Sequence, residues 1–427
     1  MKEFYCKPKL FSVLGECRGK QLVQDLTAGV IVAIIALPLS IALALASGVE
    51  PAAGVYTAII AGFLVSLLGG SRVQIAGPTA AFAAIVAGIV ASEGMSGLIL
   101  ATLMAGILLI LMGVFKLGGL IRLIPEAVTV GFTSGIAVTI FFGQIKDFLG
   151  LVYAEGLKPV ETIEKLEANF ASLSTFSWQS LLVGGISLAI LILYPKFEKR
   201  LPPSLVAVLA GSLLVRFLPA LDEGIFTIGE LYTIPAGLPP LTLGSLSLSG
   251  DAFAAALPNA VTIALLAAIE SLLSCVVADG MIGSRHNPNA ELVAQGVGNM
   301  ASVLFGGIPA TGAIARTAAN IKNGGRTPVA GMVHALVLLL VLLFLMPLAA
   351  MIPMPTIAAI LFMVAYNMSE WRKFVSLLGE KKWQNSCILL LTFLLTVIFD
   401  LIVAIAAGLG LYVLLLLWEK AGAKKTK

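Results

Sequence analysis

Long runs of apolar residues without a charged side chain alternate with short polar segments along almost the whole chain. A helix needs about 20 mostly apolar residues to cross a membrane. Charge-free runs cover residues 26–49, 51–71, 73–92, 94–115, 127–145, 168–195, 201–215, 252–269, 292–315, 327–369, 383–399 and 401–418. The run 327–369 is long enough for two spans, divided near Pro347, Pro353 and Pro355, and 306–323 forms a further short span. The pattern predicts an all-α polytopic membrane protein with fourteen spans.

The spacing of these runs divides the chain into two halves of seven spans each. We expect the first half to occupy residues 22–218 and the second to occupy 251–418. The stretch between them, 219–250, is partly rich in Pro, Gly and Ser and predicts a linker outside the bilayer. Residues 1–21 carry five basic side chains among apolar ones, which is typical of an amphipathic segment on the inner leaflet. Residues 419–427 form a basic cytoplasmic tail.

The distribution of Lys and Arg supports this number of spans. If both termini lie in the cytoplasm, 22 of the 27 basic residues fall in cytoplasmic segments, four fall outside and Arg316 lies at membrane depth. Cytoplasmic loops carry an excess of Lys and Arg, so we expect a multi-pass protein of the inner (plasma) membrane with both termini inside. On the opposite side, residues 155–170 predict a short amphipathic helix outside the bilayer.

The overall composition excludes most soluble proteins. Hydrophobic residues make up 59% of the chain and charged residues 12%, whereas soluble domains have about 45–50% and about 25%. The four cysteines are widely spaced, and His286 and His334 are too few for a haem or metal centre. We therefore expect no catalytic residues, no metal site, no cofactor and no nucleic-acid partner, but a lipid bilayer around the chain.

Two segments in corresponding positions of the halves resemble each other. Residues 67–83 read LLGGSRVQIAGPTAAFA and residues 304–318 read LFGGIPATGAIARTA. Because each half has an odd number of spans, the second half must enter the membrane upside down relative to the first. Inverted repeats with matching broken spans are typical of secondary transporters.

These segments predict that spans 3 and 10 are helical over only part of their length. The helix 79–90 would be roughly 18 Å long, whereas the hydrocarbon core is roughly 30 Å thick. Residues 73–77 must cross the remaining distance as extended chain, and so must 308–312 before a half-helix that covers 313–323. Extended backbone is tolerated at this depth only inside protein or beside a polar cavity.

Two half-helices that enter from opposite sides point their N-termini at the middle of the membrane. Each N-terminus carries about half a positive charge and several N–H groups without a partner in the helix, which together make an anion site. The side chains of Thr79, Ala80, Ala81, Ala313 and Ala315 are small enough to let an anion approach those N–H groups. The pattern favours an anion site over two ordinary kinked helices.

Charged residues inside the predicted spans suggest further roles. Arg316 lies one turn into the second half-helix, where we expect a fixed positive charge on the anion pathway. Glu270 follows a long uncharged run, with Ser274 nearby. It is a counter-charge to Arg316, a proton carrier, a cation ligand or a structural ion-pair partner, and these alternatives stay open. Asp25 and Asp251 begin the first helix of each half, where aspartate suits a cap.

Five stretches of the sequence resemble the SulP family of anion permeases, which includes bacterial sulfate, bicarbonate and dicarboxylate transporters and the motor protein prestin. They are GGSRVQIAGPTAAFAAI (69–85), VGFTSGIAVTIFFGQIKDFLG (130–150), IESLLSCVVADGMIG (269–283), GGIPATGAIARTAANIKNGGRTPVAG (306–331) and VAYNMSEWRKF (364–374). Three of them, 130–150, 269–283 and 364–374, look most like the enterobacterial C4-dicarboxylate member. The resemblance implies that spans 1–4 and 8–11 form a core domain, and that spans 5–7 and 12–14 form a gate domain.

The resemblance also implies a pocket between the two half-helix N-termini. Carried over by motif, it is lined by Leu39, Leu43, Thr79, Ala313, Ile314, Ala315 and Arg316. Prestin-like members carry more polar or aromatic side chains at several of these positions, so this pocket has fewer side-chain donors and more room. Sodium-coupled bicarbonate members carry Asp at the position of Glu270 and a hydroxyl near that of Ile314. Because Ile314 cannot bind sodium, the comparison favours a proton.

We therefore expect a secondary active transporter of sulfate, bicarbonate or a C4-dicarboxylate that works by an elevator mechanism, with proton symport or anion exchange. Which anion it carries stays open. An uncoupled anion channel and a nucleobase-type permease of the same fold are the alternatives, although Arg316 and an alanine-lined pocket argue against a nucleobase. Family members usually continue into a cytoplasmic STAS domain. This sequence ends KAGAKKTK without one, so either the domain is absent or it has been removed, and both alternatives stay open. A homodimer is left open.

Overall fold

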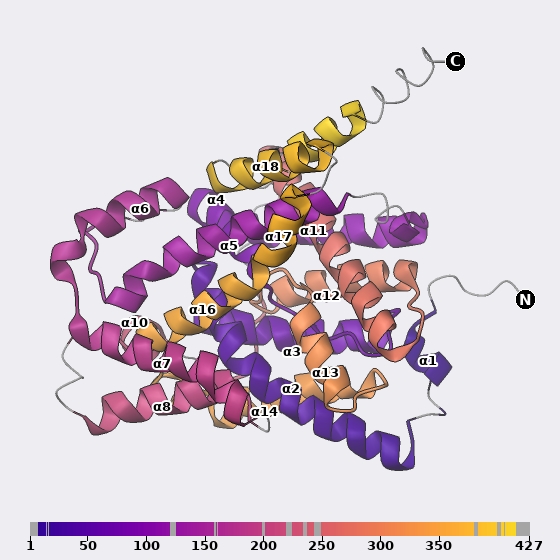
Figure 1. Cartoon of the computed structure of the whole chain (residues 1–427). Helices are drawn as coiled ribbons and strands as arrows, with labels where there is room; N and C mark the ends of the chain where they lie inside the picture. The colour runs from indigo at the N-terminus through magenta and orange to yellow at the C-terminus, as the bar shows by residue number, and fades with distance from the viewer. Residues whose placement is uncertain are drawn as a thin grey trace, which may run out of the picture.

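The computed structural model describes residues 7–13, 15, 17–119, 125–157, 159, 161–198, 201–218, 224–233, 237–242, 249–379, 383–398, 403–404 and 406–415. Among these residues, six helices are long and apolar enough to cross a membrane, and four shorter apolar helices accompany them. The described part of the chain is mostly helical (Figure 1). The prediction of an all-α polytopic membrane protein is confirmed.

The first half of the chain holds spans 1 to 7 in the predicted order. The elements are α1 (Lys9–Val13), α2 (Gly19–Ala46), α3 (Pro51–Leu68), β1 (Ala76–Gly77), α4 (Ala80–Val114), α5 (Glu126–Leu149), α6 (Thr162–Ala171), the 3-10 helix η3 (Leu173–Thr175), α7 (Trp178–Phe197), α8 (Pro203–Phe217) and α10 (Ile228–Leu231). Spans 3 and 4 both lie within α4, which Gly94 breaks with a φ of 69° and a ψ of −172°.

The second half repeats this order from the other direction. Its elements are α11 (Gly250–Ile282), α12 (Pro288–Leu304), β2 (Thr311–Gly312), α13 (Ile314–Lys322), α14 (Val329–Phe344), α15 (Met346–Ala349), α16 (Met354–Met368), α17 (Trp371–Leu378), α18 (Trp383–Ile398) and a last helix, Ala406–Leu415. The long apolar run divides between Phe344 and Met354, as its prolines predict. In both halves a short extended segment leads into a helix, which confirms the seven-plus-seven arrangement with broken spans 3 and 10.

The helices pack as two bundles. In the first, α4 packs against α11 and α12, while α14 packs against α2 and α3, and α13 lies against α11 and α2. In the second, α5 packs against α16 and α18, and α7 packs against α8 and α16. Figure 1 shows α6, α7 and α8 at the left of the molecule, and α12 and α13 toward the right. Contacts of α2 with α5, α8 and α16 form much of the seam between the bundles.

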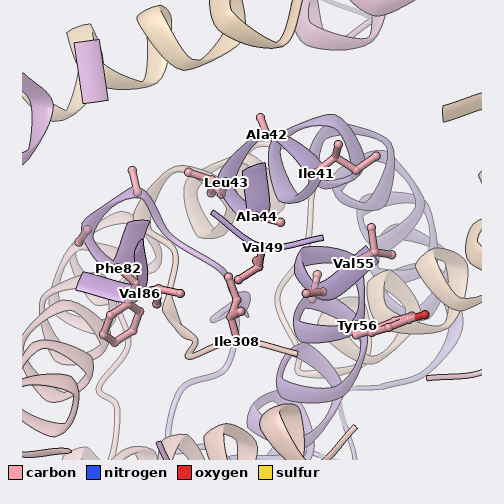
Figure 2. Close-up of a cluster of buried hydrophobic side chains, with 14 of the residues drawn as sticks. Ile41, Ala42, Leu43, Ala44, Val49, Val55, Tyr56, Phe82, Val86 and Ile308 are labelled. Carbon is pink, nitrogen blue, oxygen red and sulfur yellow. The ribbon is translucent and has the colours of Figure 1, made fainter. Parts of the chain in front are cut away.

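Small and apolar side chains fill the first bundle. Figure 2 shows Leu43 of α2, Val55 of α3, Phe82 and Val86 of α4, and Ile308 of the second extended segment within one buried cluster. Lipid offers helices no hydrophobic reason to associate, so close packing of small residues must hold them together. Through Ile308, the cluster therefore holds the second extended segment against the surrounding helices.

Asp25 does not cap its own helix, contrary to the expectation from the sequence. The helix α2 begins at Gly19, so Asp25 lies well inside it and is fully buried. Its Oδ1 accepts from the N–H of Arg326 at 2.7 Å, and its Oδ2 accepts from the Thr327 hydroxyl at 2.7 Å. Asp25 thus holds the loop before α14, which lies in the other half of the chain.

The amphipathic helix outside the two bundles is shorter than predicted. The sequence predicts helix over 155–170, whereas α6 begins at Thr162. Glu161 and Glu164 form a capping box there: the side chain of each residue accepts a hydrogen bond from the backbone N–H of the other. Such a box fixes the start of a helix, and residues 151–157 are not helical.

Candidate functional site

The two half-helices begin next to each other because the extended segments before them pair. β1 and β2 form an antiparallel pair in which Gly77 lies opposite Thr311. The N–H of Ala313 extends this ladder by donating to the carbonyl of Ile75 at 2.8 Å. The pair joins the two halves of the chain directly, so the N-termini of α4 and α13 meet at one place.

Two glycines permit this close approach. A Cβ added to Gly77 would collide with the guanidinium of Arg316, and one added to Gly312 would collide with the side-chain amide of Gln74. Glycine allows a backbone to approach other groups where any side chain would clash. Gly77 of the GPT motif (77–79) and Gly312 of the matching TGA motif (311–313) are therefore needed for the strand pair itself.

The N-termini of both half-helices are left without a side-chain cap. Thr79 and Ala313 occupy the N-cap positions with φ of −125° and −92°, and neither of these two residues accepts a side-chain hydrogen bond from the first turn. The first N–H groups of a helix have no partner within the helix. Because Ala80 and Ala81 follow Thr79, small side chains surround these donors. The arrangement can bind an anion through backbone groups.

Glu270 connects the two N-termini. It lies in the middle of α11, and its Oε2 accepts from the Thr79 hydroxyl at 2.9 Å and from the Thr311 hydroxyl at 2.9 Å. The two hydroxyls are themselves 3.3 Å apart. The next residue, Ser271, accepts from the N–H of Gly312 at 3.0 Å. One turn of α11 therefore holds the start of both half-helices, with a carboxyl group between them.

Arg316 lies behind the two N-termini. It is 1% exposed, and its Nη2 donates to the carbonyl of Pro78 at 2.8 Å. Its Nε and Nη1 have no hydrogen-bond partner in the described part of the chain. Within that same part no ion pair joins Arg316 to Glu270. Of the roles left open for Glu270, the structure therefore does not contain a direct ion pair with Arg316.

The other residues expected at the site lie on elements around it. Leu43 is buried in the same cluster as Phe82, and Leu39 is half-buried one turn earlier on α2. Ala80, Ala81 and Ala313 are buried, whereas Ile314 and Ala315 are exposed. Ser274 lies one turn beyond Glu270, and its hydroxyl donates to Thr317 at 3.4 Å. The structure thus joins Thr79 and Glu270 by contact, but it does not place Ser274 on the Glu270 carboxyl.

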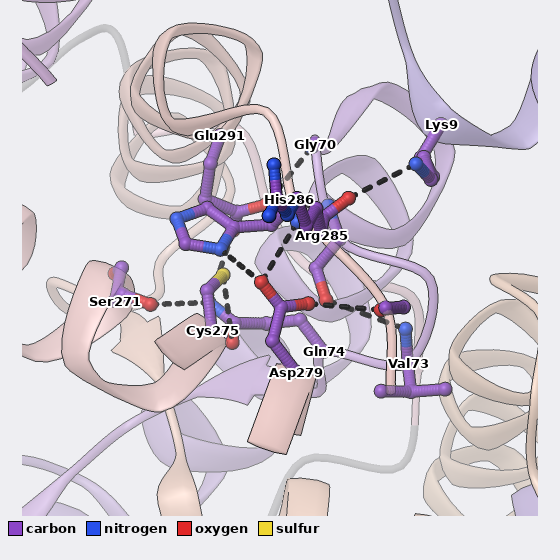
Figure 3. Close-up of polar contacts among 12 residues, drawn as sticks. Lys9, Gly70, Val73, Gln74, Ser271, Cys275, Asp279, Arg285, His286 and Glu291 are labelled. Carbon is purple, nitrogen blue, oxygen red and sulfur yellow. Dashed lines mark hydrogen bonds and ion pairs between the residues drawn. The ribbon is translucent and has the colours of Figure 1, made fainter. Parts of the chain in front are cut away.

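Three polar residues that hold the extended segments escaped the sequence analysis. Glu291 of α12 is buried, and its Oε2 accepts from the N–H groups of Gly70 and Ser71 at 2.9 and 3.2 Å (Figure 3). Gln74 donates to Glu291 Oε1 at 3.0 Å. In the second half, Asn299 exchanges two hydrogen bonds with the backbone of Ala310. A sequence signal exists for two of them, because AELVAQGVGN (290–299) places Glu291, Gln295 and Asn299 in an otherwise apolar span.

The site coincides neither with a metal cluster among the described residues nor with the cavity near the end of α5. No group of three or more His, Cys, Asp and Glu side chains that could hold a metal occurs among the described residues. A cavity of about 440 Å³ lies beyond the end of α5, lined in part by Lys146, Asp147 and Tyr153. The strand pair and the half-helix N-termini lie elsewhere, so their chemistry rests on backbone donors, hydroxyls, Glu270 and Arg316.

Comparison with known proteins places these features in a family. The sulfate permease family matches residues 22–392. The "Putative sulfate transporter YvdB" of Bacillus subtilis is 47% identical over 392 residues, which cover 90% of this chain and 72% of that protein. The "Bicarbonate transporter BicA" of Picosynechococcus is 34% identical over 394 residues, which cover 90% of this chain and 68% of that protein.

Solved structures agree with this assignment. The transmembrane domain of a cyanobacterial bicarbonate transporter, BicA, matches with a TM-score of 0.81 and 34% identity, over 90% of this chain and 98% of that one. The inward-facing murine Solute Carrier 26 family member A9 matches with a TM-score of 0.87 over 98% of this chain and 72% of that one. At 17% identity, the second likeness concerns the fold alone.

Proposed function

This chain belongs to the sulfate permease family, and on that premise we propose that it is a secondary active transporter of a small anion. The observation that carries the proposal is the β1–β2 pair, which sets the N-termini of α4 and α13 together. Two such ends supply about one positive charge through backbone donors. Arg316 adds a full charge behind them. An anion is the ligand that this arrangement suits best.

The anion binds between the half-helices, in contact with the first turns of both. Its site consists of Leu39, Leu43, Thr79, Ala80, Ala81, Ala313, Ile314, Ala315 and Arg316. The relatives bear the names of sulfate and bicarbonate transporters, so these anions come first, and C4-dicarboxylates follow. The small side chains at 80, 81 and 313 leave recognition to backbone N–H groups, which select for charge and size rather than for a particular chemical group.

Glu270 couples transport to protons, and Ser274 belongs to the same coupling region. The Glu270 carboxyl accepts from Thr79 and Thr311 at the place where the anion binds. An ionised carboxylate there repels a substrate anion and occupies the hydroxyl donors. Protonation removes that charge, so proton and anion enter together and leave together. A proton also suits the position of Ile314, whose side chain offers no oxygen to a cation.

The bundle that contains the site moves as an elevator against the other bundle. The core comprises spans 1–4 and 8–11, and the gate comprises spans 5–7 and 12–14. The strand pair and its supports lie wholly within the core. The site can therefore change its exposure from one side of the membrane to the other without a change in its own geometry.

The transporter lies in the inner membrane with both termini in the cytoplasm. Its domain boundaries follow the sequence: a cytoplasmic segment 1–21, halves at 22–218 and 251–418, an external linker 219–250 and a basic tail 419–427. The lipid bilayer surrounds both bundles.

Uptake into proteoliposomes tests the proposal. Purified protein is reconstituted, and accumulation of radiolabelled sulfate, bicarbonate and succinate is followed with and without an inward proton gradient. We expect one of these anions to accumulate above its external concentration only when the gradient is present. Equilibration without accumulation would identify an uncoupled channel, and competition by uracil alone would identify a nucleobase permease. Uptake that requires an anion on the opposite side of the membrane, and does not respond to the proton gradient, would indicate anion exchange.

A further inference from the structure

Large apolar side chains are exposed where the chain passes between two membrane spans. On α6, Ile163 is 47% exposed and Phe170 is 70% exposed. Leu173, Phe176 and Trp178, which follow on the way into α7, are exposed as well. We call these five residues the apolar stripe. A series of exposed apolar side chains outside the spans marks a place of interaction.

The exposed surface of α6 has an apolar side and a charged side. Ile163 and Phe170 are seven residues apart, so they lie within about 20° of each other around the helix. Glu164 and Glu167 are exposed on the neighbouring side. A helix with this pattern is typical of one that lies along a membrane surface, with its apolar side in lipid and its charged side in water.

Hydrogen bonds to α5 give the depth of α6. The hydroxyls of Thr162 and Thr139 are 3.0 Å apart, and the side-chain amide of Asn169 donates to the carbonyl of Phe142 at 3.1 Å. Lys146 is the first charged side chain toward the C-terminal end of α5. Thr139 and Phe142 precede it by seven and four residues, so they lie about 10 and about 6 Å deeper in the span. The helix α6 therefore lies beside the end of a membrane span, not beyond it.

The apolar stripe leads into a helix that faces lipid. Among the described residues, α7 is the least buried of the six helices that are long and apolar enough to cross a membrane. Its Leu181 and Leu182 are exposed, as is Trp178, the first residue of the helix. Tryptophan is enriched at the level of the lipid headgroups. Because α6 lies at the edge of the molecule (Figure 1), the lipid around α7 is the apolar surrounding that the stripe adjoins.

We propose that residues 162–178 bind a lipid surface, with the apolar stripe at the boundary between acyl chains and headgroups and the exposed α6 glutamates in water. Interfacial helices bury their apolar side about 5–10 Å into that boundary, which agrees with the depth of the α5 contacts. In the proposed topology this surface is the outer leaflet. The negative charges of Glu164 and Glu167 repel anionic headgroups, so zwitterionic lipid is the partner.

The consequence of this lipid contact concerns the gate, and it rests on the proposed function. The helix α6 packs against α5 and α18, both of which belong to the gate bundle. The lipid contact therefore holds the gate at a fixed depth while the core moves past it. Without the contact the gate yields to the moving core, so transport slows while the anion site itself is unchanged.

Spin labels at four positions test the lipid contact. In a variant whose four native cysteines are replaced, a nitroxide is attached to one added cysteine: Ile163→Cys, Phe170→Cys, Glu164→Cys or Glu167→Cys. In liposomes of phosphatidylcholine and phosphatidylethanolamine, collisions with oxygen, which concentrates in lipid, are compared with collisions with a water-soluble nickel chelate. We expect the oxygen-to-nickel ratio to be about fivefold higher at positions 163 and 170 than at the glutamate positions. Equal ratios at all four positions overturn the proposal. So does exclusion of both reagents from positions 163 and 170, which would show that protein, such as a second copy, covers the stripe.

Uptake kinetics test the anchoring role of α6. The double variant Ile163→Asn, Phe170→Asn removes the apolar side of the helix, whereas Glu164→Gln, Glu167→Gln leaves it intact and is the matched control. We expect the Vmax of the asparagine variant to fall about threefold while its KM changes less than about twofold, and the control to keep both values. An unchanged Vmax overturns the anchoring role. The spin-label result requires no transport, so it decides the lipid contact even for a protein that moves none of the tested anions, a result that would contradict the proposed function alone.

Discussion

Arg316 donates a hydrogen bond to the carbonyl of Pro78, a residue 238 positions earlier in the chain. The bond ties the charge of one half-helix to the residue just before the N-cap of the other. Because Pro78 has no N–H of its own, its carbonyl is the backbone group that it offers. The guanidinium of α13 is therefore held next to the N-terminus of α4.

Replacing Arg316 with Ala should weaken anion binding without unfolding the protein. The helix N-termini remain, but the full charge is lost. We expect the KM for sulfate to rise roughly tenfold, about 1.4 kcal/mol, and the KM for bicarbonate to rise less, because a divalent anion interacts twice as strongly with the same charge. Arg372→Ala, at an exposed position on α17, serves as the control. An equal rise in KM for both anions would show that the Arg316 charge does not act on the bound anion.

Replacing Glu270 with Gln should separate transport from coupling. The amide keeps an acceptor for Thr79 and Thr311 but cannot carry a proton across the membrane. We expect accumulation driven by a proton gradient to disappear, while counterflow exchange of substrate continues. The control is Glu93→Gln. Glu93 lies on α4 and accepts a hydrogen bond from Asn259, which is on α11 but about three turns away from Glu270. Gradient-driven accumulation in the Glu270 variant would remove this carboxyl from the coupling step.

Replacing Ala315 with Phe should block uptake. The residue is exposed in the first turn of α13, where a large side chain would occupy the approach to the backbone donors. We expect no measurable uptake of sulfate or bicarbonate by a protein that expresses and purifies normally. Ala315→Ser adds one oxygen and should keep uptake. If both anions still enter at the usual rate past the phenylalanine, the anion does not bind beside this helix.

Replacing Glu291 with Leu should destabilise the core. Four donors use this carboxylate, namely the N–H groups of Gly70 and Ser71 and the amides of Gln74 and Gln295. Leaving even two of them unpartnered should cost about 3 kcal/mol or more. Thermal unfolding in detergent should show a lower midpoint for Glu291→Leu than for Glu291→Gln, which retains one acceptor oxygen. Equal midpoints for the two variants would contradict this reading of the network.

Cysteine labelling should establish the orientation of the chain. In a variant whose four native cysteines are replaced, a thiol at Glu161 should react with a membrane-impermeant maleimide in intact cells. A thiol at Arg372 should react only after the membrane is broken. Both positions are exposed, so access depends on the side of the membrane alone. The opposite pattern would invert the proposed topology.

The sequence predicted the helices well because length and apolarity decide them one segment at a time. The half-helices were also predictable, since GPT and TGA break a helix locally. The β1–β2 pair was not, because two residues in each strand carry no periodic signal and the partners are far apart in the chain. The contact that the Arg316 side chain makes was not predictable either, because the position of a residue in a helix does not determine which neighbouring element a long side chain reaches. Asp25 was misread for the same reason: the residues it binds, 326 and 327, belong to the other half.

The strand pair also sets an order for biosynthesis. Gly77 can find Thr311 only after more than two hundred further residues have left the ribosome and entered the membrane. Until then the extended segment before α4 has no strand partner, and Gln74 lacks both Ser271 and Glu291. Contacts between distant residues form late because closing a long loop is slow. The first half alone therefore lacks the partners of its extended segment until α11, α12 and β2 have been made.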